Sequence, residues 1–178
     1  MNLKILSLVI IGVCILLPDV CYAFLSKDVH LLNMQNGLAD NTVSAVYKDK
    51  EGFVWFGTRN GLSRYDGRQI TNFEQSNSYP SISNLKEVFD GVLAFVDNGV
   101  FSAFDLKKER FLSVVSSSGQ GIPSRGMLQR NDSLVWVISG SELHLMKRCA
   151  SKEGELRLRI QEKYTGWDNQ DNLLVAIT

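Results

Sequence analysis

Cysteine is scarce in this chain of 178 residues, which contains three. Cys14 and Cys21 lie in an N-terminal segment that we expect to be removed, so Cys149 remains alone. A lone cysteine cannot form an internal disulfide. We interpret Cys149 as a small, partly buried residue, with a redox or intermolecular role as the alternative.

An excess of charge of either sign is also lacking. Lysine and arginine together number 19, as do aspartate and glutamate, while 44% of residues are hydrophobic. This composition is that of a globular chain. Because phosphate binding requires a basic surface, neutrality argues against nucleic acid as a partner. It is compatible with a neutral ligand such as a sugar.

No apolar run is long enough to cross a bilayer as a helix, which takes about 20 residues. The longest run, Ile5–Leu17, follows Lys4 and ends before Pro18, and small residues lie around Ala23. This pattern predicts a secretory signal peptide over residues 1–23, cleaved after Ala23. An uncleaved anchor is the alternative.

Short apolar runs separated by turn residues begin after residue 41. Thr42–Lys48 alternates apolar and polar residues. Phe53–Thr58 has the β-branched and aromatic composition of a buried strand. Asn60-Gly61 is a hairpin signal in which we expect both residues to have positive φ. With Leu62–Tyr65 and Gln69–Phe73, these runs predict a four-stranded antiparallel meander.

The same pattern recurs along the chain. Gly99, in a second Asn-Gly turn, follows Gly61 by 38 residues, and Trp136 follows Trp55 by 81. The further predicted strands are 85–89, 92–96, 100–104, 110–115, 134–138, 142–146, 156–160 and 173–177.

A spacing of about 38 to 43 residues with four strands per unit is typical of β-propeller blades. A β-sandwich or a β-barrel of short strands is the alternative. We predict an all-β fold, a partial β-propeller of about three four-stranded antiparallel blades. The expected boundaries are a signal peptide at 1–23, an N-terminal strand that latches the ring at 24–35, blade 1 at 36–80, blade 2 at 81–120, blade 3 at 121–165 and the truncated start of blade 4 at 166–178.

Residues 36–67, NGLADNTVSAVYKDKEGFVWFGTRNGLSRYDG, closely resemble the two-component regulator propeller repeat. That repeat has an N-G-L start, a D-x-x-G turn, a W-x-G-T strand, a second N-G-L and a Y-D-G end. The second blade keeps Asn98-Gly99 but has Leu93 where the tryptophan is expected. The third keeps Trp136 but has Ser139-Gly140-Ser141 in place of the turn. The full motif therefore covers only the first blade.

Proteins with this repeat are long periplasmic sensors of hybrid two-component systems, and many sense oligosaccharides. Their propellers precede a membrane helix and a histidine kinase. The resemblance implies a periplasmic, non-enzymatic signal-input chain without a cofactor. The implied partners are the remaining propeller blades and the kinase portion, an oligosaccharide ligand and a second copy in a homodimer, but not nucleic acid.

The chain matches only the beginning of that plan. It has no Gly-rich nucleotide-binding box and no phosphoacceptor histidine context, and we interpret His30 and His144 as structural. Propellers commonly close with about four to eight blades, and three blades leave open sheet edges. We therefore expect a fragment, attached to a membrane only through a missing C-terminal part.

Most motif residues have structural roles in this interpretation. Glycines permit close approach or positive φ, the tryptophans pack between blades, and Thr58 and Asp66 bond turn backbone. The set is Trp55, Gly57, Thr58, Asn60, Gly61, Leu62, Tyr65, Asp66, Gly67 and Trp136. We expect no catalytic residue and no metal, since the loop at Asp49 and Glu51 lacks the alternating ligands of a calcium site.

Ligand contacts are expected on the rim formed by the blade-connecting loops and by the turns between second and third strands. Aromatic rings bind sugar faces and planar polar side chains bind hydroxyls, so the candidates are Arg59, Tyr79, Asp97 and Trp167. Two other functions stay open. One is a propeller lyase, which needs His, Glu or Tyr clustered at the central rim, and the other is an exported interaction scaffold.

Overall fold

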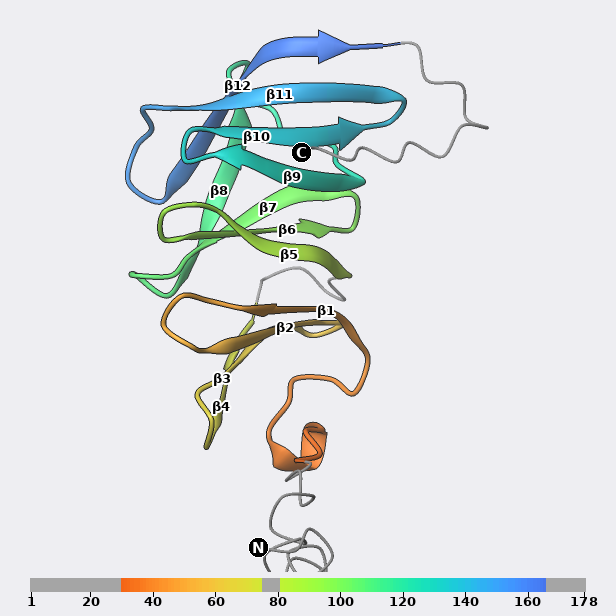
Figure 1. Ribbon diagram of the computed structural model, residues 1–178, viewed down its shortest axis with the longest axis vertical. Helices are drawn as coiled ribbons and strands as arrows, with labels where there is room; N and C mark the ends of the chain where they lie inside the picture. Colours follow the sequence, from red (N-terminus) through yellow and green to blue (C-terminus); the bar gives the residue numbers. More distant parts are fainter. Residues whose placement is uncertain (1–29, 75–80, 166–178) are drawn as a thin grey trace, which may run out of the picture. The chain divides into compact units, whose positions relative to one another are not determined.

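The computed structural model describes residues 30–74 and 81–165 (Figure 1). The chain divides into two compact units, Met1–Leu31 and Leu32–Thr178, and the fold described below lies in the second. The predicted signal peptide, Tyr79, Trp167 and the expected start of a fourth blade lie outside the described residues. Within the described part, no helix has the length and hydropathy needed to cross a bilayer.

The described part is built from strands, as the all-β prediction requires. Residues 30–33 are irregular and lead into a 3-10 turn at Met34–Asn36, in the segment expected to form the latch strand. The strands are β1 (Val43–Lys48), β2 (Val54–Thr58), β3 (Gly61–Tyr65), β4 (Ile70–Phe73), β5 (Ile82–Phe89), β6 (Val92–Asp97), β7 (Val100–Asp105), β8 (Arg110–Ser116), β9 (Gly126–Asn131), β10 (Leu134–Ser139), β11 (Glu142–Cys149) and β12 (Glu155–Tyr164).

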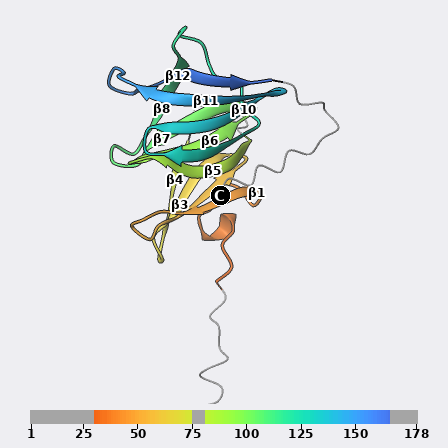
Figure 2. The same cartoon turned by 45° about the horizontal axis from the view of Figure 1, so that its top comes forward.

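Three four-stranded antiparallel blades follow one another along the chain (Figures 1 and 2). Blade 1 is β1–β4, blade 2 is β5–β8 and blade 3 is β9–β12. Strand β9 was not predicted, because half of the residues in Gly126–Asn131 are polar. Blades 2 and 3 also join into one eight-stranded sheet, since Glu155–Leu158 of β12 pairs in parallel with Ser113–Ser116 of β8. This connection gives no sequence signal.

The two Asn-Gly pairs form different turns, which corrects the expectation for the first. Thr58 pairs with Gly61, so the β2–β3 turn is Arg59-Asn60 and Gly61 already belongs to β3. Gly61 has φ of 112°, whereas Asn60 is not among the residues with positive φ. In blade 2, Asn98 (φ 48°) and Gly99 (φ 80°) both adopt positive φ, as a two-residue primed turn requires.

The hairpin register identifies equivalent positions in the three blades. The last residues of the second strands are Thr58, Asp97 and Ser139. Counting back three residues from each aligns Trp55 with Ala94 and Trp136. Ala94, not Leu93, therefore occupies the tryptophan position of blade 2.

Each blade has a face that points to the next blade, which we call its following face. Trp55 lies on the following face of blade 1, in a core with Leu93, Phe95 and Phe104 of blade 2. Ala94 lies on the following face of blade 2, in a second core with Val135, Val137 and Met146 of blade 3. Trp136 alternates with Val135 and Val137, so it lies on the following face of blade 3.

Candidate functional site

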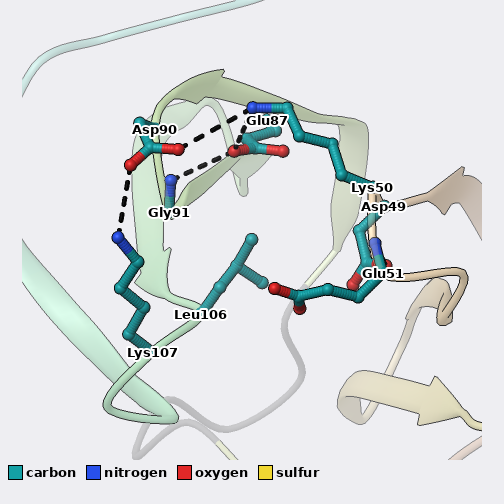
Figure 3. Close-up of a pocket in the computed structure, with 8 residues that line it drawn as sticks. All are labelled: Asp49, Lys50, Glu51, Glu87, Asp90, Gly91, Leu106 and Lys107. Atoms are coloured by element: carbon teal, nitrogen blue, oxygen red, sulfur yellow. Dashed lines mark hydrogen bonds and ion pairs between the residues drawn. The ribbon is translucent and has the colours of Figure 1, made fainter.

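A cavity of about 160 Å³ opens between the first two blades (Figure 3). It forms where the β1–β2 turn of blade 1 meets the β5–β6 and β7–β8 turns of blade 2. Its lining residues are Asp49, Lys50, Glu51, Glu87, Asp90, Gly91, Leu106 and Lys107. The volume lies below the roughly 300–1,000 Å³ of ordinary ligand pockets, so the cavity suits only a small polar group.

Charges of opposite sign alternate around the cavity. Lys50 Nζ lies 3.3 Å from Glu87 Oε1 and 3.8 Å from Asp90 Oδ1, while Lys107 Nζ lies 3.2 Å from Asp90 Oδ2. Glu87 Oε1 also accepts the Gly91 N–H at 3.0 Å. The bond from Lys107 holds the pKa of Asp90 below its ordinary value, and the bond to Glu87 raises the pKa of Lys50. The cavity is therefore polar, with its lysines already paired.

Asp49 connects the cavity to the core of the first interface. Its Oδ2 accepts the Trp55 indole N–H at 2.8 Å, and its Oδ1 accepts the backbone N–H groups of Glu51 and Phe53. Asp49 is buried and fully engaged in these bonds. This role of Asp49 was not predicted, although the D-x-x-G spacing is its signal. Within the described residues, no group of three or more His, Cys, Asp or Glu side chains could hold a metal.

The predicted ligand rim lies at the other end of the blades. Each second strand runs from the cavity end to the turn before the third strand, so Arg59 and Asp97 lie at the far ends of β2 and β6. Arg59 is exposed in its turn. Asp97 is 4% exposed, and its Oδ1 accepts the Ser81 N–H at 3.1 Å. Tyr79 and Trp167, the aromatic candidates, lie outside the described residues.

A second charged cluster lies on blade 3 and was not predicted. His144 Nε2 lies 2.9 Å from Glu142 Oε2, and Lys163 Nζ lies 2.6 Å from Glu142 Oε1. Lys163, and to a smaller extent His144, lower the pKa of Glu142. His144 pairs with Val137 in the ladder and is buried on the side of blade 2. This placement fits the structural role expected for it.

Residues 37–60 match the family model described as two component regulator propeller. The first blade carries this propeller repeat. The matched segment runs from the chain that precedes β1 through the β2–β3 turn, and it includes Asp49 and Trp55. The resemblance read from the sequence is thereby confirmed. No curated protein matches the chain.

Solved structures with the same fold include extracellular domains from B. thetaiotaomicron. One belongs to a hybrid two component system, with 20% identity, a TM-score of 0.52, and coverage of 66% of this chain and 18% of that chain. Another belongs to a one component system, with 16% identity, a TM-score of 0.57, and coverage of 77% and 21%. The chain thus spans about a fifth of each of these two structures. At these identities the likeness shows the propeller fold.

Proposed function

We propose that this chain is the ligand-sensing propeller part of an exported two-component sensor. The observation that carries the proposal is the two component regulator propeller repeat, whose Asp49 and Trp55 build the contact with blade 2. The extracellular location of the structurally similar domains supports export. In this proposal the chain has no catalytic role of its own, and a histidine kinase elsewhere in the full-length sensor receives the signal.

The proposed ligand is an oligosaccharide, bound on the rim that carries Arg59. Its guanidinium is exposed in the β2–β3 turn and can donate to sugar hydroxyls. Asp97 holds the start of β5 at the same rim through its bond to Ser81. Ligand binding would signal by favouring one arrangement of the sensor over another, which requires different affinities for the two arrangements.

Isothermal titration of the chain with a panel of neutral and acidic oligosaccharides tests the proposal. We expect saturable binding to one sugar class, weakened by about tenfold or more in Arg59→Ala, which corresponds to about 1.4 kcal/mol. Arg68→Ala removes another exposed arginine from the same blade and should leave the affinity within about twofold. Absence of binding to every sugar would refute the ligand, and cleavage of a bound sugar would favour a lyase.

A further inference from the structure

Ion pairs between the blades follow a fixed order along the chain. At the first interface, Lys50 of blade 1 pairs with Glu87 and Asp90 of blade 2, and Arg64 of blade 1 pairs with Glu109 of blade 2. In each of these contacts the earlier blade supplies the cation and the later blade the carboxylate.

The second interface repeats this order. Lys108 and Arg110 of blade 2 both approach Glu153 Oε1 of blade 3, at 2.8 and 3.0 Å. Glu153 lies in the turn between β11 and β12. The order holds for every ion pair between blades within residues 30–74 and 81–165. This order predicts that the cations on the following face of blade 3 pair with carboxylates of a polypeptide that packs against that face.

Three cations lie on that face around Trp136. The guanidinium of Arg130 lies 5.9 Å from the centroid of the Trp136 ring. Leu134 lies two residues before Trp136 and therefore on the same face. Lys147 is the ladder partner of Leu134, and Arg159 is the ladder partner of Lys147. Lys147 and Arg159 therefore share the face of Trp136. We call Arg130, Trp136, Lys147 and Arg159 the basic face. None of its three cations has an ion-pair partner among the described residues.

The indole N–H of Trp136 has no acceptor, unlike that of its counterpart in blade 1. Its Nε1 is buried without a hydrogen-bond partner in the described part of the chain. In blade 1 the acceptor is Asp49. Tyr47 is the ladder partner of Trp55, and Asp49 follows Tyr47 by two residues. The ladder partner of Trp136 is Leu128, and two residues after it stands Arg130. A cation thus replaces the carboxylate that satisfies the equivalent tryptophan.

The strand pairing adds a second electrostatic mismatch. Lys147 and Arg159 stand directly opposite each other in neighbouring strands. Like charges at opposed positions destabilise a sheet. A nearby anion relieves this repulsion, and a buried donor such as the indole N–H of Trp136 calls for an acceptor.

We propose that the basic face of blade 3 docks a polypeptide surface that carries carboxylates. One carboxylate accepts the hydrogen bond of the Trp136 indole N–H, as Asp49 does for the Trp55 indole N–H. The same carboxylate pairs with Arg130. Further carboxylates pair with Lys147 and Arg159. Strands β1–β4 of the first blade contain no aspartate or glutamate, so the first blade of a second copy could offer only turn carboxylates such as Asp66. Self-association is therefore one outcome of the test below. This inference does not depend on the oligosaccharide ligand.

Nuclear magnetic resonance of the indole N–H groups tests the proposal, with poly-L-glutamate as the probe. Trp136→Phe assigns the signal of Trp136. We expect poly-L-glutamate to shift that signal downfield and leave the Trp55 signal unchanged, because Asp49 already satisfies the Trp55 indole. The triple variant Arg130→Ala, Lys147→Ala, Arg159→Ala should weaken binding by about tenfold or more. Its control carries Lys48→Ala, Arg68→Ala and Arg125→Ala, which remove the same charge from exposed sites, and should bind like the parent.

Several outcomes overturn the proposal. Polygalacturonate that shifts the Trp136 signal where poly-L-glutamate does not would identify an acidic sugar site. A shift that depends only on the concentration of the chain itself would identify self-association. Absence of any shift, or equal weakening in the two triple variants, would show that the basic face docks no acidic polypeptide. Arg130→Asp provides an internal check, because it should shift the Trp136 signal without any probe.

Discussion

Arg64 Nη1 of blade 1 lies 2.6 Å from Glu109 Oε1 of blade 2. The same guanidinium lies over three aromatic rings, 4.9 Å from the centroid of Phe53, 5.6 Å from that of Trp55 and 5.5 Å from that of Phe73. One side chain therefore joins the outer part of blade 1 to the β7–β8 turn of blade 2. Because Arg64 is mostly buried, with 18% of its side chain exposed, its contacts are screened less than those of a surface pair.

Arg64→Ala should lower the free energy of unfolding by about 1–2 kcal/mol, the sum of a partly buried cation–π contact and an ion pair. Glu109→Ala should lower it by less, because the aromatic contacts of Arg64 remain. Urea denaturation of both single variants and the double variant measures the coupling. Additive effects in the double variant would show that the ion pair contributes nothing. Arg68→Ala, on the exposed β3–β4 turn, is the control.

Asp49→Ala should destabilise the chain by more than the loss of the Trp55 hydrogen bond alone, which is the bond that Trp55→Phe removes. Asp49 accepts one indole and two backbone N–H groups while buried. Leaving a buried donor without a partner costs about 1–3 kcal/mol. Thermal unfolding of the two variants checks the ranking. Asp49→Asn, which keeps one of the two acceptor oxygens, should retain part of the stability, and equal loss in the Asn and Ala variants would contradict this account.

Gly57→Ala should destabilise the interface between blades 1 and 2 by about 1–3 kcal/mol through overpacking. A Cβ at Gly57 would lie 2.5 Å from Ile82 Cγ2 and 3.3 Å from Ala45 Cβ. Ile82→Ala in the same chain makes room and should recover part of the loss, as measured in urea. Gly121→Ala is the matched control, because its nearest neighbour would be Val100 Cγ1 at 3.9 Å. Equal losses at the two glycines would rule out crowding as the cause.

Stability should fall on the acid side because carboxylates are paired in the folded state. Lys108, and then Arg110, lower the pKa of Glu153 from its ordinary value of 4.5. A lowered folded-state pKa gives stability that is present above the unfolded value and is lost as the pH falls through the folded value. Glu153→Gln should therefore flatten the decline of the melting temperature below pH 4.5. Glu74→Gln is the control, and an unchanged slope in Glu153→Gln would contradict the prediction.

Strand positions were largely predictable because short apolar runs alternate with turn residues. The failures have physical causes. Gly126–Asn131 forms β9 although its sequence is half polar, since it is paired on one side only, with β10. The predicted geometry of Asn60 was wrong because the turn consists of Arg59-Asn60, one residue earlier than the expected Asn60-Gly61. Of the two residues expected at positive φ, only Gly61 has it. The tryptophan position of blade 2 was assigned to Leu93 instead of Ala94. Because neighbouring residues of a strand point to opposite faces, this error of one residue placed the position on the wrong face.

The candidate site was less predictable than the fold. The cavity at Lys50, Glu87, Asp90 and Lys107 depends on side chains from two blades that the sequence separates by tens of residues. Spacing shows which residues lie in turns, but not which turns meet. The Asp49–Trp55 bond is local and was readable in principle. The missing acceptor of Trp136 emerges only when the two blades are compared in register.

The parallel pairing of β8 with β12 makes the two interfaces mechanically unequal. Blades 2 and 3 share a backbone ladder, so separating them breaks backbone hydrogen bonds along four residue pairs. Blades 1 and 2 belong to separate sheets and meet through side chains such as Arg64, Trp55 and Lys50. We therefore expect the first interface to yield before the second under strain, with blades 2 and 3 moving together relative to blade 1.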